Sequence, residues 1–275
     1  MHAFSSEKRH NGGESFDIAL LTERLRGCKT GFPLYYFENV DSTNAVAMRL
    51  AQEGAAEGTM VLADLQTAGR GRLQRVWQSP AGCNLYFSVI LRPEIALAKA
   101  VQITFLAGAA VADTIAPFCP DGIEIKWPND VLIRSRKVCG ILSELRTKNG
   151  GMTAIVGIGI NVNMKRDDFA PEYRQIATSL LEETGRRHSR EDVLCSFCTN
   201  FQRWYELFLS EGFGPIRQAW LSRTKMVGKN VRILFDTEIK EGVVSGLDED
   251  GALLLAGATG AVERIIAGDA TIIKE

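Results

Sequence analysis

The segment TAIVGIGINVNM, residues 153–164, constrains the fold of this chain more than any other. From Ala154 to Ile160 it contains only Ala, Ile, Val and Gly, and such a continuous apolar run predicts a strand buried in a sheet. We expect this strand near the centre of the sheet. Long helical patterns and a hairpin pattern occur in the same part of the chain. This mixture predicts an α/β domain, or an α+β domain with a mixed sheet.

Periodicity and turn residues predict the other elements of this domain. Helices are expected at residues 17–27, 41–54, 96–118, 190–209 and 213–224, with Asp17 capping the first and Ser42 or Thr43 near the N-cap of the second. Strands are expected at 33–40, 59–67, 84–93 and 123–128, followed by a hairpin over 131–145 that turns near Ser135 and Arg136.

The pattern changes after the last of these helices. From Lys229 onward the chain contains short alternating segments such as NVRILF, GALLLA and AVERIIA, separated by turn residues. Short strands at this spacing predict a small β-barrel. The predicted division is a disordered leader at 1–16, a mixed domain at 17–224 and a barrel at 225–275, with the boundary between Ser222 and Gly228.

Composition excludes several classes of protein. The 32 basic and 33 acidic side chains give a net charge of -1, which argues against a surface devoted to nucleic acid or an anionic membrane. We identify no apolar run of the roughly 20 residues that span a bilayer. The N-terminus is polar and lacks the apolar core of a secretory signal, so a cytoplasmic location is expected.

The cysteines and the common catalytic motifs exclude further chemistry. Cys195 and Cys198 have metal-like spacing, but Cys198 falls on an apolar helical stripe and no second Cys or His pair accompanies it, which favours core packing. There is no G-x-x-x-x-G-K-[ST] phosphate loop and no G-x-S-x-G elbow. GIGIN at 157–161 lacks the third glycine of a dinucleotide fingerprint, and three histidines in polar surroundings do not predict a His-based triad.

The most unusual stretch is QTAGRGRLQRVWQSPAG, residues 66–82, which we call the glycine–arginine loop. Gly69 and Gly71 allow backbone N–H groups to approach an anion, and the guanidinium groups of Arg70 and Arg72 match phosphate or carboxylate with two hydrogen bonds. Trp77 could stack on a flat ring. Three interpretations compete: a nucleic-acid contact, an idle surface loop, and a lid that closes over an anion.

Three other short segments carry residues of the same kinds. KWPND places Lys126, Asn129 and Asp130 beside a strand end, where ligands often bind in α/β sheets. The segment 137–140 places a lysine near a glycine on the returning strand. Glycines at 157 and 159, followed by Asn161, predict close approach of a ligand to the strand backbone. Each segment alone has an ordinary structural explanation.

Together these segments resemble the biotin protein ligase family. The resemblance rests on DSTN, QTAGRGR with a following Trp, KWPND, KVCGIL with Glu144, and GIGINVN, in the family's order and spacing, and it covers the chain from about Pro33 to the C-terminus. It implies a catalytic domain like that of class II aminoacyl-tRNA synthetases, here residues 17–224, followed by an SH3-like barrel.

The implied activity has two steps. The biotin carboxylate is joined to the α-phosphate of ATP, with Mg²⁺, and the resulting biotinyl-AMP acylates one lysine of a biotin carboxyl carrier protein. The first step requires one anion to approach another, so positioned cations rather than a general base are needed. This requirement agrees with a site that is rich in Arg and Lys and has no histidine.

The resemblance also implies roles for individual residues. Those implied to bind biotin are Ser42, Thr43, Asn44, Gln66, Arg70, Gly71, Arg72, Lys137 and Gly140. Those implied to face ATP are Trp77, Asn129, Asp130 and Asn161, with Asp130 near the metal or the loop. Catalytic charge stabilisation falls to Arg70, Arg72, Lys126 and Lys137.

Two departures from the family pattern stand out. The family often has a glycine where this chain has Gln74, beside Leu73, which predicts a stiffer lid. Only about thirty residues precede Pro33, too few for the helix-turn-helix domain of some members, so no operator binding is expected. The alternatives are a lipoate–protein ligase and a biotin-binding regulator without ligase activity. The identity of the carrier and homodimer formation through a strand edge stay open.

Overall fold

The computed structural model describes residues 15–148, 151–235, 237–257 and 260–273. Most of the predicted leader at 1–16 therefore lies outside the described residues. Its last residue corrects the prediction, because Phe16 is only 6% exposed and packs edge-on against Tyr36 at a centroid distance of 5.8 Å. The guanidinium carbon of Arg190 lies 3.9 Å from the centroid of the Phe16 ring, so Phe16 belongs to the core.

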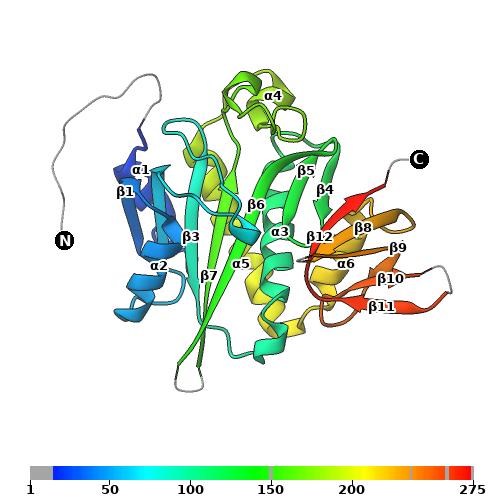
Figure 1. The fold of residues 1–275 in the computed structure, drawn as a ribbon. Helices are drawn as coiled ribbons and strands as arrows, with labels where there is room; N and C mark the ends of the chain where they lie inside the picture. The colour runs from blue at the N-terminus through cyan, green and yellow to red at the C-terminus, as the bar shows by residue number, and fades with distance from the viewer. Residues whose placement is uncertain (1–14, 149–150, 236, 258–259, 274–275) are drawn as a thin grey trace.

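A seven-stranded mixed sheet forms the first part of the chain, in the order β1-β2-β3-β7-β6-β5-β4 (Figure 1). Its strands are β1 (Leu34–Val40), β2 (Met60–Gln66), β3 (Leu85–Leu91), β4 (Ile123–Lys126), β5 (Asp130–Ile133), β6 (Arg136–Lys148) and β7 (Gly151–Ile160). Only the β1–β2 pair is parallel. The apolar strand β7 is fourth of the seven, which confirms the prediction that it is central.

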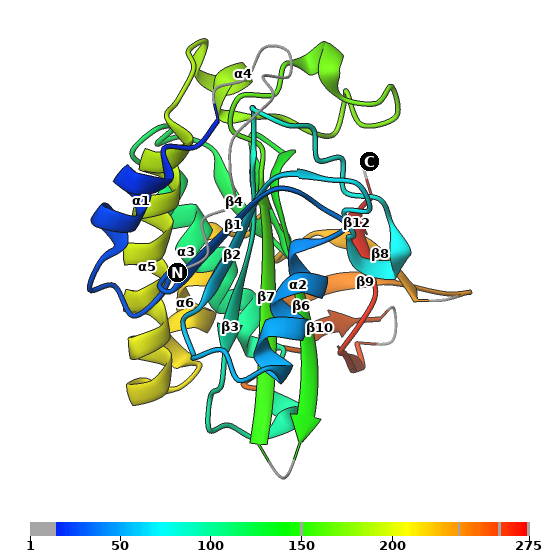
Figure 2. The same ribbon diagram turned by 90° about the vertical axis from the view of Figure 1, so that its left-hand side faces the viewer.

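Helices cover both faces of this sheet (Figure 2). They are α1 (Ile18–Leu25), α2 (Thr43–Gln52), α3 (Gln102–Ile115), α4 (Leu180–Thr184), α5 (Arg190–Glu211) and α6 (Gly214–Arg223), with short 3-10 turns at Arg72–Gln74, Leu97–Lys99 and Arg166–Asp168. Val61, Ile90 and Ile155 pack under α2, whereas their strand neighbours join the larger core with α3 and α5. Burial on both faces explains why every residue of β3 is buried.

Helix α3 corrects one expectation from the sequence. The stretch Leu97–Ile115 is long and apolar enough to cross a membrane by length and composition alone, with a mean hydropathy of 1.2. However, 78% of it is buried inside the protein, because α3 packs between the sheet and α5. The apolar character of α3 is therefore explained by its position in the core.

The described residues after α6 form a five-stranded antiparallel sheet in the order β11-β10-β9-β8-β12. The strands are β8 (Asn230–Phe235), β9 (Glu238–Leu247), β10 (Leu253–Ala256), β11 (Val262–Ile265) and β12 (Asp269–Ile272). The predicted division after residue 224 lies between the end of α6 and the start of β8, whereas the predicted range from Ser222 to Gly228 includes the last two residues of α6. Two hydrogen bonds fasten this terminal sheet to the helices: Gln102 Nε2 donates to the Glu249 carbonyl at 3.0 Å, and Arg217 Nε donates to the Leu247 carbonyl at 2.7 Å.

The cysteines behave as core residues. Cys198 is fully buried on α5, as predicted, and burial raises the pKa of its thiol well above the usual value. Cys195 is half-buried against the same core. Among the described residues, no group of three or more His, Cys, Asp or Glu side chains could hold a metal ion.

Candidate active site

A cavity of about 280 Å³ lies between the glycine–arginine loop and the strands β5, β6 and β7. Every residue that the sequence assigned to the site lines it: Ser42, Thr43, Asn44, Gln66, Arg70, Gly71, Arg72, Trp77, Lys126, Asn129, Asp130, Lys137, Gly140 and Asn161. The individual roles of these residues stay predictions. Their convergence excludes the interpretation of the glycine–arginine loop as a surface loop without partners.

One end of the cavity is a cluster of buried, hydrogen-bonded polar groups. The Thr43 backbone N–H donates to Gln66 Oε1 at 2.9 Å, and Gln66 Nε2 donates to Ser79 Oγ at 2.9 Å. Asn44 Oδ1 accepts from the Ser88 hydroxyl at 2.6 Å. Because each side chain is fixed by a neighbour, this end presents preorganised donors and acceptors to a polar ring.

The glycines of β7 allow two side chains to lie against the strand. A Cβ at Gly157 would lie 2.1 Å from Oδ1 of Asn44, and a Cβ at Gly159 would lie 2.3 Å from Nε1 of Trp77. Any side chain at either position would displace Asn44 or Trp77. The sequence predicted that a ligand approaches the backbone at these two glycines. In the structure, the side chains of Asn44 and Trp77 lie against the backbone at these positions.

The glycine–arginine loop is folded as a small hairpin. The Gly71 N–H donates to the Arg75 carbonyl at 2.7 Å, and the Trp77 N–H donates to the Gly69 carbonyl at 2.9 Å. At its tip Leu73 and Gln74 have φ angles of 53° and 57°, in the left-handed region that favours glycine. The backbone therefore explains why a glycine is suited to position 74.

Positive charge dominates the cavity. Arg70, Arg72, Arg75, Lys126 and Lys137 line it, against two carboxylates, Asp130 and Asp269. Lys137 Nζ lies 2.6 Å from Asp130 Oδ1 and 5.3 Å from the centroid of the Trp77 ring. Lys126 forms no ion pair with any residue that the structure describes. Such an arrangement can bind an anion with more than one negative charge.

Asp269 is one of the site residues that the sequence did not reveal. It begins β12 in the terminal sheet and forms an ion pair with Arg75, and its Oδ1 lies 3.7 Å from Arg72 Nη1. Arg72 Nη1 also donates to the Gly268 carbonyl at 3.2 Å and to Asn129 Oδ1 at 3.4 Å. Burial lowers the pKa of Arg72, and Asp269 opposes this effect. No local motif marks Asp269, because its role comes from a contact between distant parts of the chain.

A segment of residues 169–178 forms the remaining wall and was also not predicted. Phe169, Tyr173, Ile176 and Ala177 line the cavity there. The Lys137 N–H donates to the Ile176 carbonyl at 2.7 Å, and the Thr178 N–H donates to the Lys137 carbonyl at 2.9 Å. The wall is thus bonded to the backbone of Lys137.

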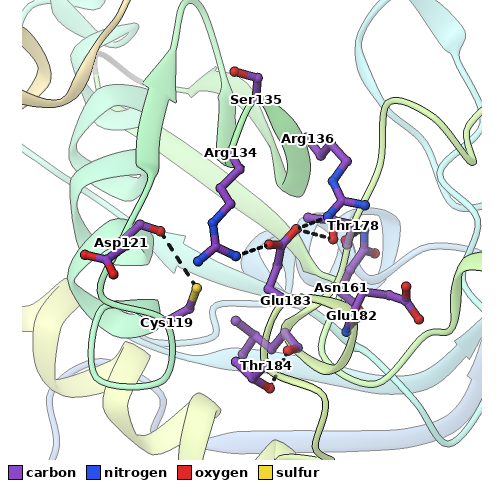
Figure 3. A network of polar contacts seen from close by, with 12 residues as sticks. Cys119, Asp121, Arg134, Ser135, Arg136, Asn161, Thr178, Glu182, Glu183 and Thr184 are labelled. Carbon is purple, nitrogen blue, oxygen red and sulfur yellow. Dashed lines mark hydrogen bonds and ion pairs between the residues drawn. The ribbon is translucent and has the colours of Figure 1, made fainter.

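Glu183 connects this wall to the turn between β5 and β6 (Figure 3). Its side chain is 1% exposed and accepts hydrogen bonds from Arg134, Arg136 and Thr178, each at 2.7 Å. Asn161 completes the network, because its Nδ2 donates to the Thr178 carbonyl at 3.0 Å. The β5–β6 turn, α4 and the cavity wall therefore meet at one buried carboxylate.

Comparison with known proteins adds independent information. A sequence model described as the Biotin/lipoate A/B protein ligase family matches residues 36–163, and one described as the Biotin protein ligase C terminal domain matches residues 227–271. The bifunctional ligase/repressor BirA of Bacillus spizizenii is 40% identical over 247 residues, which cover 88% of this chain and 76% of that protein. The biotin–[acetyl-CoA-carboxylase] ligase of Paracoccus denitrificans is 39% identical over 224 residues, which cover 80% of this chain and 92% of that protein.

Solved structures agree with the sequence comparison. The biotin protein ligase from Aquifex aeolicus in complex with biotin and ATP superposes with a TM-score of 0.77 at 32% sequence identity. The match covers 88% of this chain and 99% of that chain, so it includes both sheets. The predicted fold class, including the terminal barrel, is confirmed.

The first prediction concerns Glu183. Replacing it with alanine leaves two arginines and Thr178 without their shared acceptor, and because Arg134 is partly exposed we expect a loss of only about 2 kcal/mol in the free energy of unfolding. Urea denaturation measures this loss. The matched control is Glu182→Ala in the same helix, with an expected change below about 0.5 kcal/mol. Equal losses in the two variants would contradict the account.

The second prediction concerns Gln74. A β-branched residue is strained at positive φ, so Gln74→Val should open the hairpin and speed tryptic cleavage after Arg72 or Arg75 about fivefold or more. Gln74→Gly, which suits this backbone, should be cleaved at about the rate of the parent protein. Mass spectrometry of timed digests identifies the bonds cut. Equal cleavage of the valine and glycine variants would show that φ at position 74 does not control the loop.

Proposed function

The chain belongs to the biotin protein ligase family, and from this premise we propose how its cavity performs the reaction. The protein is an ATP-dependent ligase that activates biotin as biotinyl-5'-AMP and transfers it to a carboxylase carrier. One observation supports the assignment of the chemistry to this cavity: it joins a buried polar cluster, suited to a neutral ring, to five cations, suited to a carboxylate and phosphates.

Biotin is placed with its ring in the polar cluster. Ser42, Thr43, Asn44 and Gln66 would bind the ureido group, whose N–H and C=O groups need partners when they leave water. The biotin carboxylate then extends toward Arg70 and Lys137. Apolar atoms of Ile158 and Leu142, which also line the cavity, would contact the body of the ligand.

The first half-reaction is limited by electrostatic repulsion. A carboxylate oxygen of biotin attacks the α-phosphorus of ATP, the new O–P bond forms, and the bond to pyrophosphate breaks with its electron pair leaving on pyrophosphate. Arg70, Arg72, Lys126 and Lys137 would offset the charge that accumulates, and removal of one such donor typically costs about 3 kcal/mol in the barrier. Lys126, which has no ion pair among the described residues, is available to the phosphate without displacing a partner.

Asp269 gives the terminal sheet a part in this step. Its single carboxylate forms an ion pair with Arg75 and lies 3.7 Å from Arg72 Nη1, and it thereby connects the loop hairpin to the terminal sheet. We propose that the phosphates replace Asp269 as the partner of Arg72. The loop is then preorganised before ATP arrives, because its arginines are already turned toward the cavity.

ATP would lie with its adenine between Trp77 and the wall at residues 169–178. Asn129, which also lines the cavity, would face ATP. Both polar atoms of its side-chain amide are engaged: Nδ2 donates to the Ile141 carbonyl at 2.8 Å, and Oδ1 accepts from Arg72. Asn161 holds the wall through Thr178, so we assign it a positioning role.

Mg²⁺ would accompany the ATP phosphates. Mg²⁺ usually takes one or two protein carboxylates and completes its shell with phosphates and water. Asp130 is the carboxylate placed for this, although Lys137 already occupies one of its oxygens. Bound there, Mg²⁺ would further reduce repulsion between the two anions.

The partners of the protein are proposed with the function. The acceptor is the biotin carboxyl carrier protein of a biotin-dependent carboxylase. The name of the Paracoccus relative gives acetyl-CoA carboxylase as the acceptor for that protein. A cytoplasmic location, the absence of DNA and membrane binding, and homodimer formation stay predictions.

A transfer assay tests the proposed function. The protein is incubated with ATP, Mg²⁺, a biotin carboxyl carrier domain and labelled biotin, and in parallel with labelled lipoate and a lipoyl domain. We expect label on the carrier from biotin only, with a rate that falls at least about tenfold in Lys126→Met because a preorganised cation is lost. Transfer of lipoate alone would show that the protein is a lipoate–protein ligase. Biotin binding without any transfer would indicate a biotin-binding regulator.

A further inference from the structure

A second groove, of about 400 Å³, lies on the outer side of the glycine–arginine loop. It shares six lining residues with the first cavity: Arg70, Gly71, Arg72, Asn129, Ile141 and Leu142. The loop and the edge of β6 therefore separate two spaces that meet at the same residues. A molecule in this outer groove would lie against the place where the biotin carboxyl group is activated.

The outer groove has an apolar rim. Leu73, Val101, Leu145 and Ile266 line it and are all exposed, Ile266 to 76%. Ile266 comes from the connection between β11 and β12, Leu73 from the glycine–arginine loop, Leu145 from β6 and Val101 from the N-cap of α3. Exposed apolar side chains gathered from four parts of a protein at the entrance to its active site are typical of a surface that contacts another protein.

Glu144 is the only carboxylate among the described residues that line this groove. Its side chain is 34% exposed, and Oε1 lies 3.7 Å from Arg70 Nη2. Asn44 Nδ2 donates to Oε2 at 2.6 Å, and Asn44 is itself fixed by Ser88. Glu144 is thus held rigidly between the polar cluster of the first cavity and the outer groove.

The second half-reaction needs a negative charge at this place. The acceptor is a lysine whose ammonium has a pKa of about 10.4 in water, so it arrives charged at neutral pH. The cavity that it must reach is lined by cations, which repel an ammonium. A carboxylate at the entrance would offset that repulsion and hold the ammonium near the carbonyl group that the amine attacks after it loses a proton.

We propose that the outer groove receives the segment of the carrier protein that bears the acceptor lysine, and that Glu144 binds its ammonium group. The inference rests on the proposed function and identifies where its second substrate enters. Arg70 and Arg72 also line this groove, but the proposed function assigns them to the carboxyl and phosphate groups of biotinyl-AMP. The carboxylate of Glu144, inside an apolar rim, is then left to meet a protein segment that presents one cation. The ammonium group of the carrier would pair with Glu144, and apolar side chains of the carrier would pack against the apolar rim of the groove.

Transfer of the biotinyl group to the acceptor lysine proceeds through the free amine. The ammonium first loses a proton to water, and the free amine attacks the biotinyl carbonyl carbon. The C–N bond of the amide forms, the C–O bond to the phosphate breaks with its electrons leaving on AMP, and the nitrogen releases a second proton to water. Glu144 is a binding residue in this step and transfers no proton.

The test separates the two half-reactions in Glu144→Gln. Glutamine keeps an oxygen for the Asn44 amide but removes the charge. We expect kcat/KM for the carrier to fall about tenfold or more, while formation of biotinyl-AMP without carrier changes less than about twofold. Ile266→Ser, which removes an exposed apolar side chain of the rim without adding charge, should give the same separation. Glu241→Gln, which removes an exposed carboxylate paired with Arg232, is the matched control and should change neither half-reaction.

The outcomes are distinguishable. A parent protein that forms no biotinyl-AMP would overturn the proposed function itself. A parent protein that forms it, together with a Glu144→Gln variant that acylates the carrier at the parent rate, would overturn only the inference. Equal losses in the two half-reactions would also overturn it, because Glu144 would then act through Asn44 on the biotin end of the cavity.

Discussion

The ion pairs of Asp269 with Arg72 and Arg75 connect the two sheets of this protein at the active site. They stabilise two features of the glycine–arginine loop at once: its hairpin form and the orientation of its cations. Hydrogen bonds from Gln102 and Arg217 fix the terminal sheet independently, so Asp269 acts as a rigid anchor for the loop. In the proposed mechanism, the terminal sheet therefore contributes to the chemistry by positioning charge.

The rest of the site depends on how closely side chains lie against β7. The bare positions at Gly157 and Gly159 admit Asn44 and Trp77, which bound the two ends of the cavity. Asn44 then connects the biotin end to Glu144, and Trp77 lies under the ammonium of Lys137. In the proposed mechanism, a central strand without side chains at two positions thus determines where both substrates of the adenylation step can lie.

The sequence predicted the elements from local patterns. It assigned the residues of the cavity through the resemblance of several segments, taken together, to one family, and all of these residues line the cavity. The central position of β7 follows from its apolar run, and KWPND and the glycine–arginine loop contain cations at recognisable spacing. Asp269, Glu183 and the wall at residues 169–178 could not be predicted, since their roles arise from contacts between segments far apart in the chain. The left-handed backbone at Gln74 was also missed, because glutamine does not signal positive φ as glycine does.

A crystal structure with a non-hydrolysable analogue of biotinyl-AMP tests the central claim most directly, namely that the loop arginines pass from Asp269 to the phosphate. The account predicts that Arg70 and Arg72 contact the carboxyl and phosphate oxygens of the analogue, that Arg72 no longer pairs with Asp269, and that the terminal sheet stays in place. An analogue bound in the cavity while Arg72 remains paired with Asp269 would contradict it.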